Sequence, residues 1–118
     1  MLVSASDPVG AALRGALDGL ALRQRVAADN IANIDTPGFR AAAVDFETSL
    51  RSAIADGALE RGDVLPTVSA TDDPPGVDGN NVDLAEETMV QMQAVLQYQL
   101  LTRAIDGRFS SITAAIGR

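Results

Sequence analysis

The chain contains no cysteine and no histidine, and all nine of its basic residues are arginine. The absence of cysteine excludes a disulfide, a thiolate metal site and a cysteine nucleophile. The absence of histidine removes the side chain that most often acts as a base or metal ligand near neutral pH. The serines also have no histidine or lysine to activate them. We therefore expect no enzyme activity, no cofactor and no catalytic metal.

Aromatic residues are scarce as well, at 3% of the chain, with no tryptophan and one tyrosine, Tyr98. The apolar fraction is still 47%, and small or aliphatic side chains supply most of it. Thin alanine-rich faces suit the packing of one helix on another better than a large globular core. At 118 residues, we expect a single domain over residues 1–118.

The net charge of −7 is unevenly distributed. Residues 41–88 carry eleven acidic and two basic residues, whereas residues 1–40 are balanced and residues 89–118 are slightly basic. Nucleic-acid binding depends on clustered basic side chains that contact phosphates. An acidic chain without a basic stripe is therefore not expected to bind nucleic acid.

Long hydrophobic runs are also missing. No apolar stretch approaches the roughly 20 residues that span a bilayer, so we expect no direct membrane insertion. The first eight residues have neither a basic segment nor a continuous apolar run, so we expect no cleaved signal peptide.

Residues 8–34 are predicted to form a long N-terminal helix. Asp7 followed by Pro8 is typical of an N-cap and a first helical residue. Side chains along it then recur at alternating steps of four and three, a heptad-type seam, which comprises Leu13, Leu17, Leu20, Gln24, Ala27, Ile31 and Ile34. Three glycines in the first half weaken this helix, which we expect to be firm only when packed.

Residues 35–82 are predicted to contain a turn, a short helix over residues 43–55 and an irregular acidic segment. Pro37 and Gly38 suit the two central positions of a type II turn. Residues 56–81 hold three of the five prolines, and their only extended run, residues 64–68, contains Pro66. Proline is a poor ladder residue, so this run is expected to be loop or weak strand.

A second long helix is predicted over residues 83–117. Asp83 is a good N-cap, and Glu86 stands at the capping-box spacing behind it. One apolar face is lined by Met89, Met92, Leu96 and Leu100. The predicted fold is therefore mainly α. Its long N- and C-terminal helices pack as an α-helical coiled-coil-like pair, with a short helix and an irregular acidic middle segment.

Two short polar motifs stand beside the long helices, residues 30–39 and residues 78–87. The acidic and amide groups from Asp78 onward suggest a calcium loop, but Val82 occupies the fifth position, where an oxygen ligand is required, so no metal is expected. The adjacent acids Glu86 and Glu87 are read as solvated or capping. For Asn30 and Asn33 two readings stay open: their amides help to end the first helix, or they bridge to a neighbouring subunit.

The first motif resembles the N-terminal signature of the bacterial flagellar axial proteins, the family of rod, hook and hook-associated subunits. Within that family, the turn sequence followed by residues 44–47 is similar to the proximal rod subunits, as are the second motif and Tyr98 with Gln99. The resemblance covers nearly the whole chain. The acidic pair at residues 86–87 departs from it, since a single glutamate followed by an apolar residue is expected there.

The resemblance implies a structural subunit of the proximal rod that polymerises helically and is exported by the flagellar type III apparatus. Implied partners are copies of itself, other flagellar rod proteins and components of the export-gate and MS-ring junction, on the periplasmic side of the inner membrane. The alternative is a cytoplasmic helical adaptor or export chaperone. The residues implied in subunit contacts are Asn30, Asn33, Thr36, Pro37, Gly38, Phe39, Asp78, Gly79, Asn80, Asn81, Val82, Asp83 and Tyr98.

Overall fold

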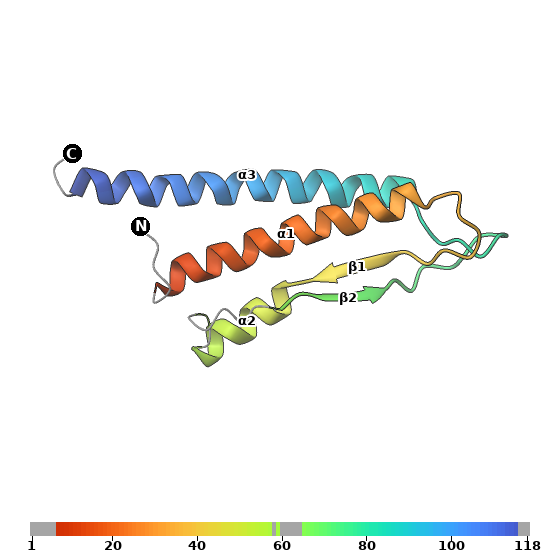
Figure 1. The fold of residues 1–118 in the computed structure, drawn as a ribbon, viewed down its shortest axis with the longest axis horizontal. Helices are drawn as coiled ribbons and strands as arrows, with labels where there is room; N and C mark the ends of the chain where they lie inside the picture. The colour runs from red at the N-terminus through yellow and green to blue at the C-terminus, as the bar shows by residue number, and fades with distance from the viewer. Residues whose placement is uncertain (1–6, 58, 60–64, 116–118) are drawn as a thin grey trace.

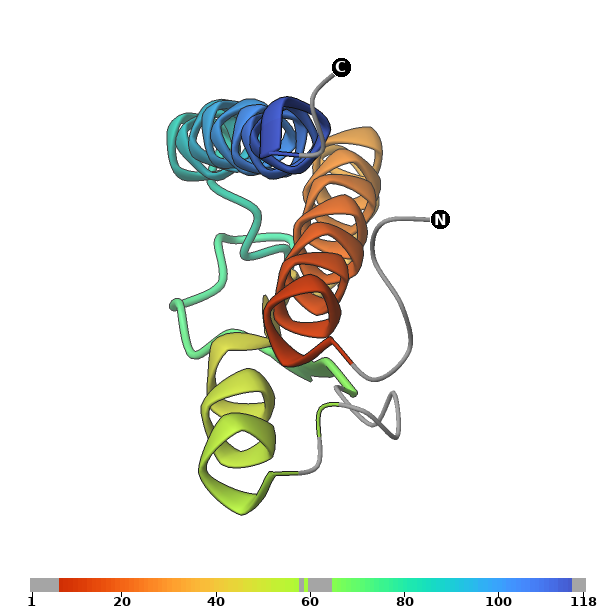
Figure 2. The same cartoon turned by 90° about the vertical axis from the view of Figure 1, so that its left-hand side faces the viewer.

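The computed structural model describes residues 7–57, residue 59 and residues 65–115. Its elements are α1 (Pro8–Ala32), β1 (Ala42–Asp45), α2 (Glu47–Asp56), β2 (Thr67–Ala70) and α3 (Leu84–Ala115). The molecule is elongated, with extents of 63 × 29 × 17 Å. α1 and α3 lie side by side and run in opposite directions, and α2 with the two strands lies on the other side of α1 (Figures 1 and 2). The mainly helical fold class is confirmed.

Local capping signals explain where the long helices begin. The Asp7 carboxylate accepts a hydrogen bond from the Val9 backbone N–H at 3.1 Å, and Pro8 follows as the first helical residue. The same carboxylate pairs with Arg108 on α3 at 2.9 Å, which ties the start of α1 to the neighbouring helix. At the start of α3, Asp83 accepts from the Glu86 N–H at 3.2 Å.

The observed helix ends differ slightly from the expected ones. α1 stops at Ala32 instead of residue 34, and Asn33 is its C-cap. α3 is described to Ala115, and the last residues of the expected helix, 116 and 117, lie outside the described residues.

The prediction for residues 43–55 was wrong at its start. Residues 42–45 form β1, which pairs antiparallel with β2 and places Val44 opposite Val68. The helix begins only at Glu47, because the Asp45 carboxylate accepts from the Thr48 N–H at 3.0 Å and from its hydroxyl at 2.8 Å. β2 begins directly after Pro66, so the proline stands outside the strand and removes no ladder hydrogen bond.

The core consists of two small clusters rather than one large centre. Ala16, Leu20 and Phe46 meet Ala94 of α3 in the first cluster, whereas the second joins Ala11, Ala53 and Leu59. Gly19 lets the Phe46 ring approach the backbone of α1, since a Cβ at this position would overlap the ring. This glycine therefore weakens the helix locally but permits the packing that attaches β1 and α2 to it. Of the predicted seam, only Leu20 and Ala27 are buried, and its other members are half-buried.

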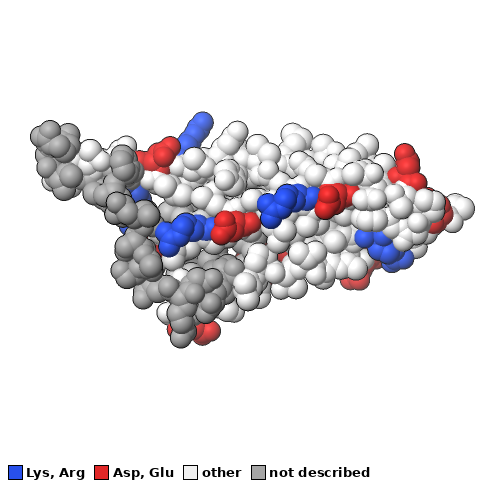
Figure 3. All heavy atoms as spheres, in the orientation of Figure 1, with Lys and Arg blue, Asp and Glu red and all other residues white. Residues whose placement is uncertain are grey.

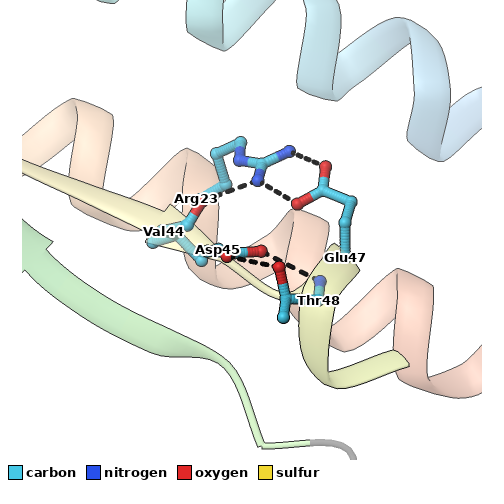
Figure 4. A network of polar contacts seen from close by, with 5 residues as sticks. All are labelled: Arg23, Val44, Asp45, Glu47 and Thr48. Carbon is cyan, nitrogen blue, oxygen red and sulfur yellow. Dashed lines mark hydrogen bonds and ion pairs between the residues drawn. The ribbon is translucent and has the colours of Figure 1, made fainter. Parts of the chain in front are cut away.

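A bidentate ion pair fixes the start of α2 against α1 (Figure 4). The Arg23 guanidinium donates to both Glu47 oxygens at 2.9 and 2.7 Å, donates to the Val44 carbonyl at 2.6 Å, and lies over the Phe46 ring. Hydrogen bonding from Arg23 lowers the pKa of Glu47 below its ordinary value. One arginine thus connects α1, β1 and α2.

Candidate functional site

Asn30 lies on the buried side of α1 and connects three elements. Its side-chain N–H groups donate to the Ala42 carbonyl at 2.8 Å and to the Glu87 carboxylate on α3 at 3.0 Å. Its side-chain oxygen accepts from the Ala42 N–H at 3.1 Å. Because Asn30 is 1% exposed, these bonds satisfy groups that water does not reach. The hydrogen bonds of the Asn30 side chain that the structure shows go to Ala42 and Glu87 of its own chain.

Asn80 holds the end of α1 from the second motif. Its side-chain N–H groups donate to the carbonyls of Asn33 and Thr36, both at 2.8 Å. Its side-chain oxygen accepts from the Val82 N–H at 2.8 Å. The carbonyls that α1 and the following turn leave without a helical partner are therefore satisfied by a residue far along the chain.

Asn81 likewise forms hydrogen bonds with backbone groups of the segment that follows the turn. Its side-chain oxygen accepts from the Ala41 N–H at 2.6 Å, and its side-chain N–H groups donate to the Thr71 hydroxyl and the Asp73 carbonyl. Its backbone N–H donates to the Phe39 carbonyl at 3.3 Å. Asn80 and Asn81 therefore lock the two motifs together.

Two glycines allow the turns of the two motifs to touch. Gly38 has a φ of +76° and follows Pro37, and the Phe39 N–H donates to the Thr36 carbonyl, so the predicted type II turn is confirmed. The Gly38 N–H donates to the Asp78 carbonyl at 2.9 Å, and a Cβ on Gly79 would lie 3.3 Å from the Gly38 Cα. We call Asn30, Asn33, Asn80, Asn81 and these two turns the polar junction.

Asn33 and Glu87 make different hydrogen bonds in this region. Asn33 is half-buried and helps to end α1: its side-chain N–H donates to the Asp29 carbonyl at 2.8 Å, and its side-chain oxygen accepts from the Thr36 hydroxyl. Glu87, in contrast, was read as a solvated or capping charge, yet it is 7% exposed and bonded to Asn30. The only hint in the sequence was that the acidic pair departs from the family pattern. That departure did not indicate whether Glu87 is buried or exposed.

The acidic side chains around the start of α3 raise one pKa. Asp73 raises the pKa of Glu86 above its ordinary value, with smaller contributions from burial and from the charges of Asp83 and Glu87.

No group of acidic side chains within the described residues is arranged to hold a metal ion. None of the helices described is long and apolar enough to cross a membrane. What the junction can do is hold the loops and the two long helices in one arrangement.

The other notable surface lies on α3, on the side that faces away from α1. α3 packs against α1 through Ala94, which is 0% exposed, and the half-buried Leu101 packs against the same core cluster. The opposite side carries a line of exposed apolar side chains, the outer ridge, formed by Met89, Met92, Leu96 and Leu100 with exposures of 59, 67, 57 and 55%. The sequence predicted this line as an apolar face. The structure shows that α1 does not cover it.

The outer ridge is also free of charge. No acidic or basic residue occurs between Glu87 and Arg103. A helix that is apolar on several sides is typical of one that contacts more than one neighbour. Tyr98 stands apart from the polar junction and lines a hollow between α3 and α1 with Ala21 and Ala28.

The sequence is similar to known flagellar proteins. The family described as Flagella basal body rod protein matches residues 12–40. The flagellar basal body rod protein FlgB of Escherichia coli (strain K12) is 33% identical over 128 aligned positions, which cover 90% of this chain and 93% of that protein. FlgB of Borrelia hermsii is 34% identical over 85% of this chain and 89% of its own, and FlgB of Bacillus subtilis (strain 168) is 29% identical over 88% and 89%.

Proposed function

Because the chain belongs to the FlgB family of flagellar basal body rod proteins and is a structural subunit of that rod, we propose that it polymerises helically through its two long helices. As a rod subunit it assembles with copies of itself and with other flagellar components, and it serves motility. The alternative of a cytoplasmic adaptor or export chaperone has no support, since the relatives are rod proteins.

The observation that carries this proposal is the outer ridge of α3. Four apolar side chains more than half exposed, without a charge among them, are unfavourable in water. Contact with another subunit would remove that apolar area from water, at about 25 cal/mol for each Å². Head-to-tail contacts that do not close on themselves produce a helical filament. A rod subunit needs such a surface, whereas a chain that acts alone does not.

The exposed part of the two motifs is proposed to meet neighbouring subunits as well. Asn30, Asn80 and Asn81 are buried and use their amides within the chain, but Thr36, Pro37, Gly38 and Asp78 are exposed at the tip of the molecule. The buried asparagines would then set the shape of the tip, and the exposed residues would touch the next subunit. Residues 1–118 would act as one unit in these contacts.

The position in the rod is proposed from the family pattern of the two motifs. The chain would lie in the proximal rod, on the periplasmic side of the inner membrane, and link the export gate and MS-ring region to the other rod proteins. It would reach this place through the flagellar type III export apparatus. Its role there would be structural, without enzymatic activity or a cofactor.

The test is to purify basal bodies from the source bacterium with and without the gene, and to image them while probing for the chain. We expect the chain at the base of the rod, and rings without a rod when the gene is deleted. Normal rods in the deletion strain, with the chain confined to the soluble fraction of the parent, would contradict the proposal.

A further inference from the structure

A shallow groove lies between α1 and α3, beside the exposed face of α1. Two adjoining hollows that share Ala28 and Gln91 form it. Its α1 side includes Ala21, Ala28 and Ala32. Its α3 side includes Thr88 and Tyr98, and Met92 of the outer ridge stands at its edge. Small side chains on one wall leave room for the side chains of a third helix.

The groove is almost uncharged. Arg25 is the only charged residue among the described residues that line it. Arg25 also belongs to a row of exposed, alternating charges on α1, formed by Arg14, Asp18, Arg25 and Asp29. Figure 3 shows such a row of alternating basic and acidic side chains across one face. The charges thus stand along the edge of the groove and leave its floor uncharged.

We propose that the outer ridge of one copy docks into the groove between α1 and α3 of the next copy. This inference rests on the proposed function, since it names the partner surface for the ridge. The other hollow beside α3 fits the ridge less well, because Arg23, Glu86 and Glu87 line it together with Val90. An uncharged ridge docked there would take water away from these charged groups without offering them a new partner, which costs free energy.

The lengths of the two surfaces agree. From Met89 to Leu100 the ridge spans eleven helical steps, and so does the groove wall from Ala21 to Ala32. At 1.5 Å per residue, both are roughly 17 Å long. Copies related by one repeated operation along a filament share their direction, so the docked α3 runs parallel to the α3 of its host and antiparallel to α1. Met89 then lies beside Ala32, and Leu100 beside Ala21.

This register brings two unpaired charges together. Arg103 continues the line of the ridge, three residues after Leu100, and Asp18 precedes Ala21 by three residues on the host. Both are exposed, and neither makes an ion pair within the described residues. In the docked arrangement, Arg103 of one copy meets Asp18 of the next. The complementary pair would fix the register that the uncharged ridge alone leaves free.

Charge reversal tests the register. Arg103→Asp and Asp18→Arg should each lower incorporation into basal bodies by about tenfold, and the double variant should restore it, because like charges in contact oppose binding. Arg51→Asp, a reversal at an exposed position on α2, is the matched control and should incorporate normally. Failure of the double variant to recover would overturn the pairing.

Cysteine cross-linking tests the docking itself. Because the chain has no cysteine of its own, no native thiol can form a competing disulfide. Copies carrying Leu100→Cys are expressed together with copies carrying Ala21→Cys, and basal bodies are oxidised. We expect a disulfide-linked pair only between the two kinds of copy, and none between Leu100→Cys and Ser52→Cys copies. Links among Leu100→Cys copies alone, or no links in rods that contain the chain, would overturn the inference. Absence of the wild-type chain from basal bodies would instead refute the proposed function.

Discussion

The polar junction and the outer ridge differ in where their side chains find partners. In the junction, Asn30, Asn80 and Asn81 are 1, 8 and 4% exposed, and every one bonds to groups of the same chain. On the ridge, Leu96 and its neighbours are more than half exposed. The distinctive motifs thus hold the subunit together, whereas the leucines and methionines of the ridge are the side chains that we propose for contacts between subunits. Substitutions in the two regions should therefore affect different properties.

The largest effect on stability is expected at the centre of the junction. Asn30→Leu keeps the size of the side chain but leaves the Ala42 N–H and carbonyl and the Glu87 carboxylate without their amide partner. We expect the free energy of unfolding to fall by about 3 kcal/mol, measured by urea denaturation. Asn33→Leu is the control, because its side chain bonds only to nearby residues of the helix end, and it should cost less than half as much. Equal costs would contradict the central role of Asn30.

A moderate effect is expected at the turn. Gly38→Val places a β-branched residue at a φ of +76°, although no atom stands in the way of its Cβ. We expect a loss of about 1–2 kcal/mol from backbone strain alone. In cells, assembly of the rod should decline more than export of the chain. Normal swimming of the variant would contradict the requirement for a residue that tolerates positive φ at this turn.

Gly107→Ala is the matched control for the turn. Gly107 lies within α3, has no positive φ, and a Cβ there meets nothing within 4 Å. This change should stabilise the helix by about 0.5–1 kcal/mol, the opposite sign from Gly38→Val.

A smaller effect concerns the ion pair between Arg23 and Glu47. Its hydrogen bonds lower the pKa of Glu47 from an ordinary value of 4.5, so the pair stabilises the fold above pH 4.5. That contribution is lost as the pH falls through the lowered value. Glu47→Gln should cost about 1 kcal/mol or less at pH 7, since the pair is partly exposed. The difference between variant and wild type should shrink below pH 4.5, measured by thermal melting across pH. A constant difference would contradict the assignment.

Sequence patterns predicted the features that depend on neighbouring residues. The starts of α1 and α3 follow from Asp7 with Pro8 and from Asp83, and the type II turn follows from Pro37 with Gly38. These signals act within one turn of helix, so they can be read without knowing the rest of the fold.

Features that depend on distant residues could not be predicted. β1 pairs with a strand more than twenty residues away, and Asn80 caps a helix 47 residues before it. Which of several asparagines meets which carbonyl is decided by the packing of the loops. The sequence also did not show which apolar side of α3 faces α1, because α3 is apolar on several sides and contacts with distant residues, such as the packing of Ala94, select the inner side.

If the ridge serves assembly and the junction serves folding, Leu96→Glu should separate the two roles. Leu96 is 57% exposed, so a glutamate there should change the free energy of unfolding by no more than about 0.5 kcal/mol. The measurement compares this value with the amount of the variant in purified basal bodies. We expect unchanged stability and no incorporation. A Leu96→Glu chain that is as stable as the wild type and enters the rod normally would contradict this expectation.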